Sequence, residues 1–240
     1  MVWDYNDRTP TLRPPAAARL RFTPPKILGS YNIPHAIWGD DASICHEVPT
    51  HVWNVMQILV PKTHLERAAT CLVNCLSVFS RQTTFPPNKE IAGLSRCYLD
   101  DCIVLASSKP LRTTADYIIL IPDEIFHFDV TNPASVQAPP KSFGLPDEFD
   151  KVGVPSFSSL LNALLYCSEN FSSSDEKTTS DVRRRIYVQL VTLVAWRWRE
   201  PWEELYNSPE EYPIKLREIR DCLSPESVPI FDRIHTKPQH

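Results

Sequence analysis

Two adjacent carboxylates that follow a lone glycine are the first residues whose types and spacing suggest chemistry. Gly39 closes a predicted strand, and Asp40 and Asp41 begin a predicted short helix. Carboxylates repel an anionic phosphate and attract an ammonium or guanidinium group. We therefore predict that Asp40 and Asp41 are catalytic groups acting on a cationic substrate that binds at Gly39. The alternative stays open that they only stabilise the positive end of the helix dipole.

A second group of candidate residues combines arginine, tryptophan and glutamate between residues 183 and 204. Its three consecutive arginines, at 183–185, cover about 200° of a helix, so at most two of them share a face. A groove of arginine and indole suits an RNA backbone with exposed bases. A solvated helix start followed by an aromatic core explains the same residues. The predicted catalytic residues of this group are Glu200 and Glu203, and the predicted substrate-binding residues are Arg183, Arg184, Arg197, Arg199, Trp198 and Trp202.

Composition limits the classes of function. The 240 residues carry a formal net charge of −4, so no overall field attracts nucleic acid, and we expect no DNA partner. An RNA partner would need a local basic patch. The chain has no run of about 18 apolar residues, which predicts no membrane span. Its 5 glycines against 23 prolines exclude a glycine-rich phosphate loop and predict stiff connections. The sequence leaves the oligomeric state open.

Cysteine usage predicts an intracellular protein without a metal centre. Seven cysteines without a CxxC pair, and no apolar leader with a basic start, predict reduced thiols and a cytoplasmic location. Cys71 and Cys75 lie one turn apart on a predicted helix. No histidine or second cysteine pair is placed to complete four ligands. We therefore predict buried thiols and no metal.

The elements that position these residues follow from hydrophobic periodicity and from proline. Strands and helices are mixed first and helices alone follow, which predicts an α+β fold: a mixed sheet with flanking helices and a helical C-terminal part. Predicted strands cover residues 35–38, 52–60, 96–99, 102–106, 116–121 and 125–130, and predicted helices cover 26–32, 40–47, 65–79, 156–170, 181–199 and 212–223. The predicted segments are an irregular proline- and arginine-rich arm (1–25), an α/β core (26–130), a proline-rich crossing segment (131–155), a helical subdomain (156–228) and a tail (229–240).

Residues 33–72 resemble a large family of proteins from filamentous fungi. The stretch WGDDASICHEVPT is similar to a WGEDA-type turn followed by VPT. The resemblance implies a minimal nucleotidyltransferase-like fold, in which the glycine turn holds a nucleoside triphosphate and two carboxylates on the next strand hold a divalent metal ion. Asn54 and Met56 stand where those carboxylates are expected, and neither suits Mg²⁺. Asn54 is therefore a predicted substrate-binding residue rather than a metal ligand.

The leading functional hypothesis is a transferase of fungal secondary metabolism. The chain is similar in size, thiol use and local basic patches to arginine-containing cyclodipeptide synthases. These enzymes condense arginine with a second amino acid, both delivered by aminoacyl-tRNA. The resemblance implies an acidic D-D-x-x-E stretch, whose nearest counterpart runs from Arg199 to Glu203. It also implies that Glu200 or Glu203 orients the attacking α-amino group or takes its proton, with aminoacyl-tRNA as partner and no cofactor.

Two alternatives remain. The first is a non-catalytic binding protein that keeps the nucleotidyltransferase fold with a degraded metal site. The second is an active nucleotidyl- or phosphotransferase that uses Mg²⁺ held by Asp40, Asp41 and one of Asp100, Asp101 or Asp116. Convergence of these carboxylates favours metal chemistry, and convergence of the two glutamates on an arginine-lined cleft favours the synthase. Scattered carboxylates favour the binding protein.

Overall fold

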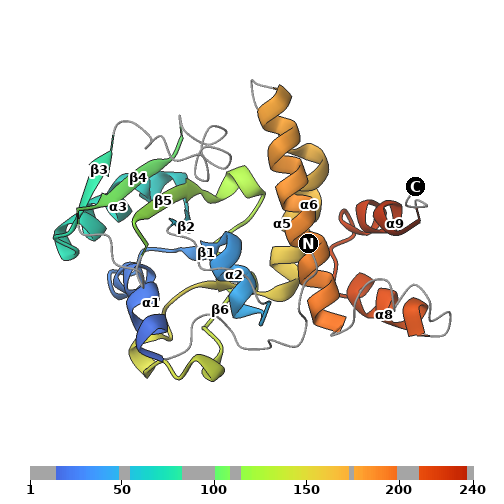
Figure 1. Cartoon of the computed structure of the whole chain (residues 1–240), viewed down its shortest axis with the longest axis horizontal. Coiled ribbons are helices and arrows are strands. Elements are labelled where there is room, and N and C mark those ends of the chain that lie inside the picture. The colour runs from blue at the N-terminus through green and yellow to red at the C-terminus, as the bar shows by residue number, and fades with distance from the viewer. Residues whose placement is uncertain are drawn as a thin grey trace.

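A five-stranded mixed sheet forms the centre of the α/β part. The computed structural model describes residues 15–48, 55–82, 101–108, 115–172, 176–198 and 211–236. Within these residues the strand order is β1-β2-β5-β4-β3 (Figure 1). The parallel neighbours are β2 and β5, whereas the other three neighbouring pairs are antiparallel. The strands are β1 (Ala36–Trp38), β2 (Val55–Val60), β3 (Phe79–Gln82), β4 (Ile103–Ser107) and β5 (Tyr117–Pro122). The predicted α+β class with a mixed sheet is therefore confirmed.

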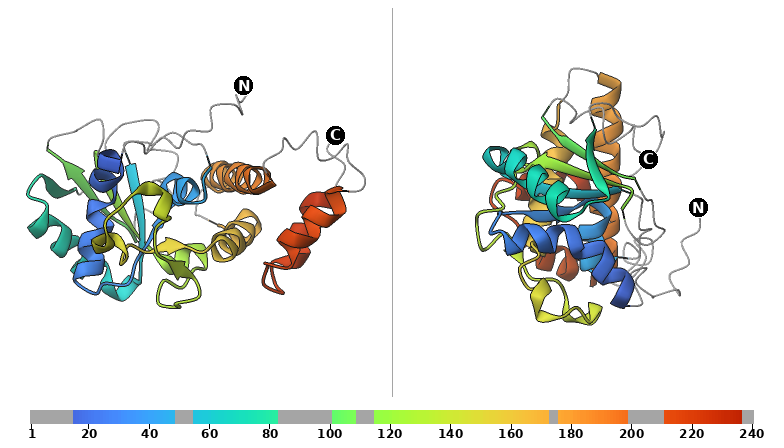
Figure 2. Two further views of the ribbon diagram at one scale, coloured as in Figure 1. Left: turned by 90° about the horizontal axis from the view of Figure 1, so that it is seen from below. Right: turned by 90° about the vertical axis from the view of Figure 1, so that its left-hand side faces the viewer.

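The two parallel strands are buried because helices and loops cover both faces of the sheet. In β2 the side chains from Met56 to Val60 are buried, and Gln57 is the one polar residue among them. Such continuous apolar runs are typical of strands without a solvent face. On one side, α3 (Leu65–Cys75) packs on β3, β4 and β5, with α1 (Pro15–Ser30) beside it. The short helix α2 (Gly39–Cys45) lies between the sheet and the C-terminal helices (Figure 2).

The N-terminal segment is helical from Pro15, so the prediction of an irregular arm over residues 1–25 is wrong for its second half. Helix α1 contains Pro24 and Pro25, which cost helical hydrogen bonds. Tertiary packing compensates, because Phe22 is fully buried and stacks on Phe143 with ring centroids 5.9 Å apart. Near its end, a Cβ at Gly29 would lie 2.6 Å from the carbonyl oxygen of Lys151, so only glycine allows this close approach.

Residues 131–155 cross from the sheet to the helical part, as their prolines predict. They form two short strands, β6 (Val136–Gln137) and β7 (Val154–Pro155), which pair antiparallel. Two 3-10 turns, η3 (Lys141–Phe143) and η4 (Asp147–Phe149), lie between them. The backbone N–H of Ile37 in β1 donates to the carbonyl oxygen of Gly153 at 2.9 Å. A side chain at Gly153 would collide with the carbonyl of His35, so this attachment requires glycine.

The C-terminal part consists of helices, and the core continues into it. Helix α5 (Phe157–Asn170) is capped by Ser156, whose hydroxyl accepts from the backbone N–H of Ser159 at 3.4 Å. It packs on α6 (Glu176–Trp198), and α8 (Glu211–Arg220) and α9 (Val228–Thr236) lie beyond them (Figure 1). One cluster of buried apolar side chains extends from α1 through the sheet to α9. No described helix has the length and apolarity that a membrane crossing requires.

Three further element predictions are wrong. Residues 65–79 were expected to form one helix, but α3 ends at Cys75 and Phe79 begins β3. Residues 125–130 were expected to form a strand, but η2 (Asp123–Phe126) is a 3-10 turn that ends at His127, whose φ of 51° is left-handed. The residues after 228 were expected to form a tail, but α9 buries Ile230 and Phe231, and it packs on α5. The predicted strand at residues 96–99 lies outside the described residues.

We predict that His35 makes the protein lose stability as the pH falls from about 6.5 to about 4. Its Nδ1 lies 2.8 Å from the carbonyl oxygen of Ile33, and its Nε2 accepts from the N–H of Gly153 at 3.3 Å. Only the neutral ring can accept at Nε2, whereas Nδ1–H donates to Ile33 in either protonation state. Burial accordingly lowers the pKa of His35 from 6.5 to about 4. In that interval the unfolded chain binds the extra proton, so the free energy of unfolding should fall by about 3 kcal/mol.

Urea unfolding between pH 4 and pH 7 measures this loss. The variant His35→Gln should show a smaller change in the free energy of unfolding between pH 4 and pH 7. The slope of this free energy against pH, and not the absolute stability of the variant, tests the prediction. The matched control His127→Asn changes an exposed histidine at a φ of 51°, which asparagine tolerates. It should keep the wild-type slope. Burial also lowers the pKa of His46, whose smaller contribution persists in both variants. Equal slopes in the two variants would contradict the prediction.

Candidate functional site around the Gly39 turn

The glycine turn is held in a conformation that favours glycine. Gly39 follows β1, begins α2 and has a φ of 63°. A Cβ there would lie 3.2 Å from the side-chain oxygen of Gln57, which faces the turn from β2. The Gln57 side chain is 8% exposed, and its amide has no hydrogen-bond partner among the described residues. An uncommitted amide therefore lies directly beside the turn.

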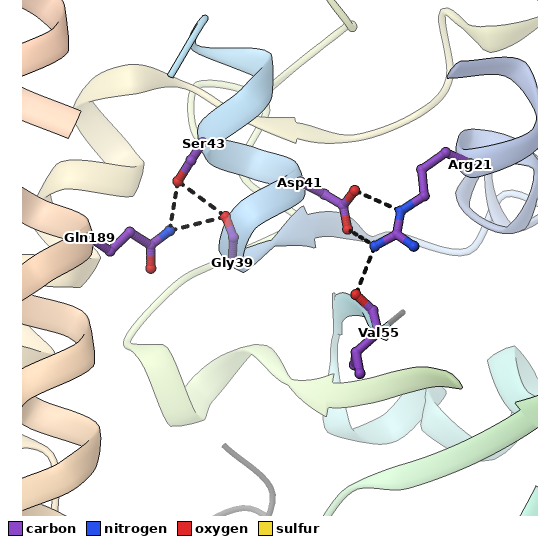
Figure 3. Close-up of polar contacts among 6 residues, drawn as sticks. All are labelled: Arg21, Gly39, Asp41, Ser43, Val55 and Gln189. Carbon is purple, nitrogen blue, oxygen red and sulfur yellow. Dashed lines mark hydrogen bonds and ion pairs between the residues drawn. The ribbon is translucent and has the colours of Figure 1, made fainter. Parts of the chain in front are cut away.

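A buried ion pair lies beside the turn, between Arg21 of α1 and Asp41 of α2 (Figure 3). Nε and Nη2 of Arg21 donate to the two carboxylate oxygens of Asp41 at 2.8 and 2.7 Å. Nη2 also donates to the carbonyl oxygen of Val55 at 2.7 Å, at the start of β2. The side chains of Arg21 and Asp41 are 2% and 3% exposed. One guanidinium thus joins α1, α2 and β2, and its Nη1 has no hydrogen-bond partner among the described residues.

Helix α6 contacts the same turn from the opposite direction. Nε2 of Gln189 donates to the carbonyl oxygen of Gly39 and to the hydroxyl of Ser43, both at 3.0 Å (Figure 3). The hydroxyl of Ser43 donates in turn to the carbonyl of Gly39 at 3.3 Å. The turn and the helix that follows it are therefore fixed by side chains from α1 and α6.

The candidate carboxylates do not gather at one point. Asp116 precedes β5, next to the start of β2, where burial raises its pKa and the charge of Arg21 opposes that rise. Asp101 binds Lys62 at 3.2 Å, and Glu124 binds the same lysine at 3.4 Å. These three residues lie at the other end of β2 and β5. Asp41 and Asp116 therefore share the neighbourhood of a guanidinium, whereas Asp101 is remote, and Asp100 lies outside the described residues.

The predicted site residues have different places. Asp40 lies half-buried in the first turn of α2, adjacent to the ion pair. Arg183 donates to the carbonyl oxygen of Phe171 at 2.9 Å, so it holds α6 to the end of α5. Arg184 and Arg197 are exposed, and their 13-residue separation along α6 corresponds to about 20 Å. They do not converge. Trp198 ends α6, and its side chain is outside the described part, as are the residues Asn54, Arg199, Glu200, Trp202 and Glu203.

The sequence analysis missed the residues that hold the turn. Arg21 was assigned to an irregular arm, although Ala18 and Phe22, four residues apart, gave a helical signal beside it. Gln57 is the only polar residue in the apolar strand VMQILV, which was a detectable signal. Nothing local marks Gln189 as a contact of a turn that is 150 residues away.

No metal-binding group is evident in the described part of the chain. It contains no cluster of three or more His, Cys, Asp or Glu side chains that could hold a metal ion. Met56 is fully buried, so it faces core atoms. Cys75 is exposed and its Sγ lies 3.6 Å from the hydroxyl of Tyr31, so the prediction of two buried thiols on α3 is wrong for this residue.

Comparison with known proteins returns nothing: no protein-family model matches the sequence, and no curated protein or solved structure matches it either. The resemblance of WGDDASICHEVPT to the fungal family therefore stays a prediction.

We predict that removing one charge of the Arg21–Asp41 pair destabilises the protein strongly, whereas replacing both residues with apolar ones is tolerated. Arg21→Met should lower the free energy of unfolding by about 3–5 kcal/mol, because it leaves the Asp41 carboxylate buried without its cation. The double variant Arg21→Met/Asp41→Leu should recover most of that loss, because it leaves no buried charge. Urea unfolding curves provide the measurement.

An exposed ion pair that also has two hydrogen bonds serves as the control. Arg81 donates to both carboxylate oxygens of Glu66 at 2.8 Å, and both side chains are exposed. Arg81→Met should change stability only slightly, because water and salt screen this pair. If Arg21→Met proved as mild as Arg81→Met, or if the double variant were no better than the single one, the pair would not have the role assigned to it.

Proposed function

We propose that the chain is a nucleotidyltransferase-like binding protein in which the buried guanidinium of Arg21 replaces the metal ion of the transferases. One observation carries the proposal: Arg21 binds Asp41 and the carbonyl of Val55 at the start of β2. The resemblance puts metal-bound carboxylates on that strand. The strand order supports the proposal. Strands β1 and β2 are antiparallel and are joined by the glycine turn and α2, and the other neighbour of β2 is the parallel strand β5.

A fixed guanidinium does different chemistry from Mg²⁺. It offers directed N–H donors and no open coordination position, so it does not act as a Lewis acid on a phosphoryl group. In this chain Asp41 also neutralises its charge, which leaves neither a free cation for phosphate nor a free carboxylate for a substrate guanidinium. Met56 is buried, and Asp101 lies at the far end of β2. These features favour a binding protein over an active transferase.

The ligand expected at the turn is the uncharged part of a nucleotide. The Gln57 amide both donates and accepts hydrogen bonds, which complements the amide-like edge of a nucleobase. It has no partner among the described residues, so binding a base there breaks no protein hydrogen bond. Asp40 follows Gly39 in the first turn of α2, where a negative charge disfavours a phosphate at the turn. We therefore propose a nucleoside as the ligand class.

Thermal melts with each of the four nucleosides test the nucleoside proposal. At least one nucleoside should raise the melting temperature by mass action, and Mg²⁺ should add nothing. Gln57→Met keeps the size of the side chain and should remove the shift, whereas Gln137→Met, at an exposed position on β6, should keep it. Absence of a shift with all four nucleosides would refute binding at the turn. A further rise when Mg²⁺ is added with ATP would instead support the active transferase.

A second candidate is the aminoacyl-tRNA-dependent, arginine-containing cyclodipeptide synthase. The observation that favours it is on α6, where Arg184 and Arg185 are exposed beside Tyr187 and Val188, which are 38% and 52% exposed. Exposed arginine next to an exposed aromatic ring suits RNA. The predicted catalytic residues Glu200 and Glu203 follow the end of this helix in the sequence.

Expression in a host with ordinary aminoacyl-tRNAs tests the synthase. An arginine diketopiperazine should be detected by mass spectrometry, and the double variant Arg184→Gln/Arg185→Gln should reduce it. Arg217→Gln, at an exposed position on α8, is the matched control and should retain full output. Folded protein without product would refute the synthase, and full output from Glu203→Gln would remove Glu203 as the base.

A further inference from the structure

A histidine at the end of α2 has one ring nitrogen fixed and the other uncommitted. His46 caps the C-terminus of α2, and its backbone N–H donates to Ser43. Its Nε2 lies 2.9 Å from the carbonyl oxygen of Pro155. A carbonyl only accepts, so Nε2 carries the proton and Nδ1 presents a lone pair. Among the described residues Nδ1 has no hydrogen-bond partner.

An arginine lies over the same aromatic ring as this histidine. The rings of His46 and Phe157 meet edge to face, with centroids 5.8 Å apart. Cζ of Arg197 lies 5.4 Å from the centroid of the Phe157 ring. Arg197 is exposed in the last turn of α6, and no ion pair between described residues includes it. The guanidinium of Arg197 and the lone pair of His46 thus lie beside the same aromatic ring.

The surroundings keep the imidazole neutral. Burial is the main cause that lowers the pKa of His46, the bond to Pro155 opposes it, and the charge of Arg197 lowers it further. Among the described residues, no acidic group is one of these causes, and the ring lies next to the Pro155 carbonyl from β7, Phe157 from α5 and Arg197 from α6. The lone pair is therefore available at neutral pH, as a general base requires.

We propose that His46 and Arg197 form a second site, in which Arg197 binds an oxyanion of a substrate and Nδ1 of His46 accepts a proton from the substrate's nucleophilic O–H or N–H group. The proton moves from the nucleophile to Nδ1, giving an imidazolium whose Nε2–H stays on Pro155. The deprotonated nucleophile then bonds to the acyl carbon or the phosphorus that bears the oxyanion, the bond from that atom to the leaving group breaks, and Nδ1 returns the proton to the leaving group, which restores the neutral ring. This inference goes beyond the proposed binding function, because the site needs neither the Gly39 turn nor a metal ion. The oxyanion is a phosphate or a carboxylate, since both suit a guanidinium.

A histidine titration by NMR tests the oxyanion site, with inorganic sulfate as the probe at constant ionic strength. Sulfate stays doubly charged from pH 4 to 8, so a change in the titration reports binding. Sulfate on Arg197 should raise the pKa of His46. Arg197→Gln should raise it without sulfate and abolish the effect of sulfate. Arg184→Gln, a matched exposed arginine on the same helix, should alter neither. A His46 titration unmoved by sulfate or by Arg197→Gln would overturn the oxyanion site.

Diethyl pyrocarbonate tests the proton acceptor separately. A free imidazole nitrogen attacks one carbonyl of the reagent, which transfers a carbethoxyl group and releases carbon dioxide and ethanol. His46 should be modified, and sulfate should slow the reaction. His35, with both ring nitrogens hydrogen-bonded in the core, should not react in the folded protein. An unmodified His46 under conditions that modify the exposed His127 would overturn the role of Nδ1 as an acceptor.

Discussion

The fold depends on satisfying one buried guanidinium. Removing Arg21 from water is expensive, and the cost is offset only because Asp41 and the carbonyl of Val55 meet it with good geometry. These partners come from a helix and a strand that are separated in sequence from α1. The position of α1 therefore cannot change without leaving a charge uncompensated. The same requirement fixes the start of β2 and the inner side of α2 relative to each other.

Helix α2 connects both sites because it is held on several sides. Arg21 binds it from α1, Gln189 binds its first turn from α6, and His46 at its end is tied to Pro155. The uncommitted Gln57 amide lies near one end of this seven-residue helix, and the uncommitted His46 nitrogen follows the other. Few polar atoms remain free in such a tightly bonded element. The Gln57 amide and Nδ1 of His46 are therefore the best indicators of where a ligand binds.

Much of the fold could be predicted because local sequence signals mark where its elements begin and end. Apolar runs ended by Gly39, Pro61 and Pro122 located three strands of the sheet to within about three residues. Helix α5 was predicted one residue too long, and its first predicted residue, Ser156, is the cap. The predicted short helix after Gly39 is α2. The part of α1 before residue 26 was missed because prolines outweighed a weak periodicity, and packing on the crossing segment decides its conformation.

The site was predictable in its chemistry and unpredictable in its partners. The carboxylate beside the glycine was expected to attract a guanidinium, and Asp41 does bind one, but it belongs to Arg21 of the same chain. That pairing spans 20 residues, and the Gln189 contact to Gly39 spans 150. Neither follows from spacing or periodicity, because both arise only when distant elements pack. His46 likewise gains its fixed tautomer from Pro155, which is 109 residues away.

The attachment of Gly153 to β1 also affects how this molecule can associate. A three-residue strand at the margin of a sheet presents backbone groups that another chain could pair with. In β1 the outward N–H of Ile37 is already occupied by Gly153, and the absence of a side chain at Gly153 lets the backbones meet at contact distance. The crossing segment of the same chain therefore covers the free edge of β1, which blocks pairing between the β1 strands of two copies.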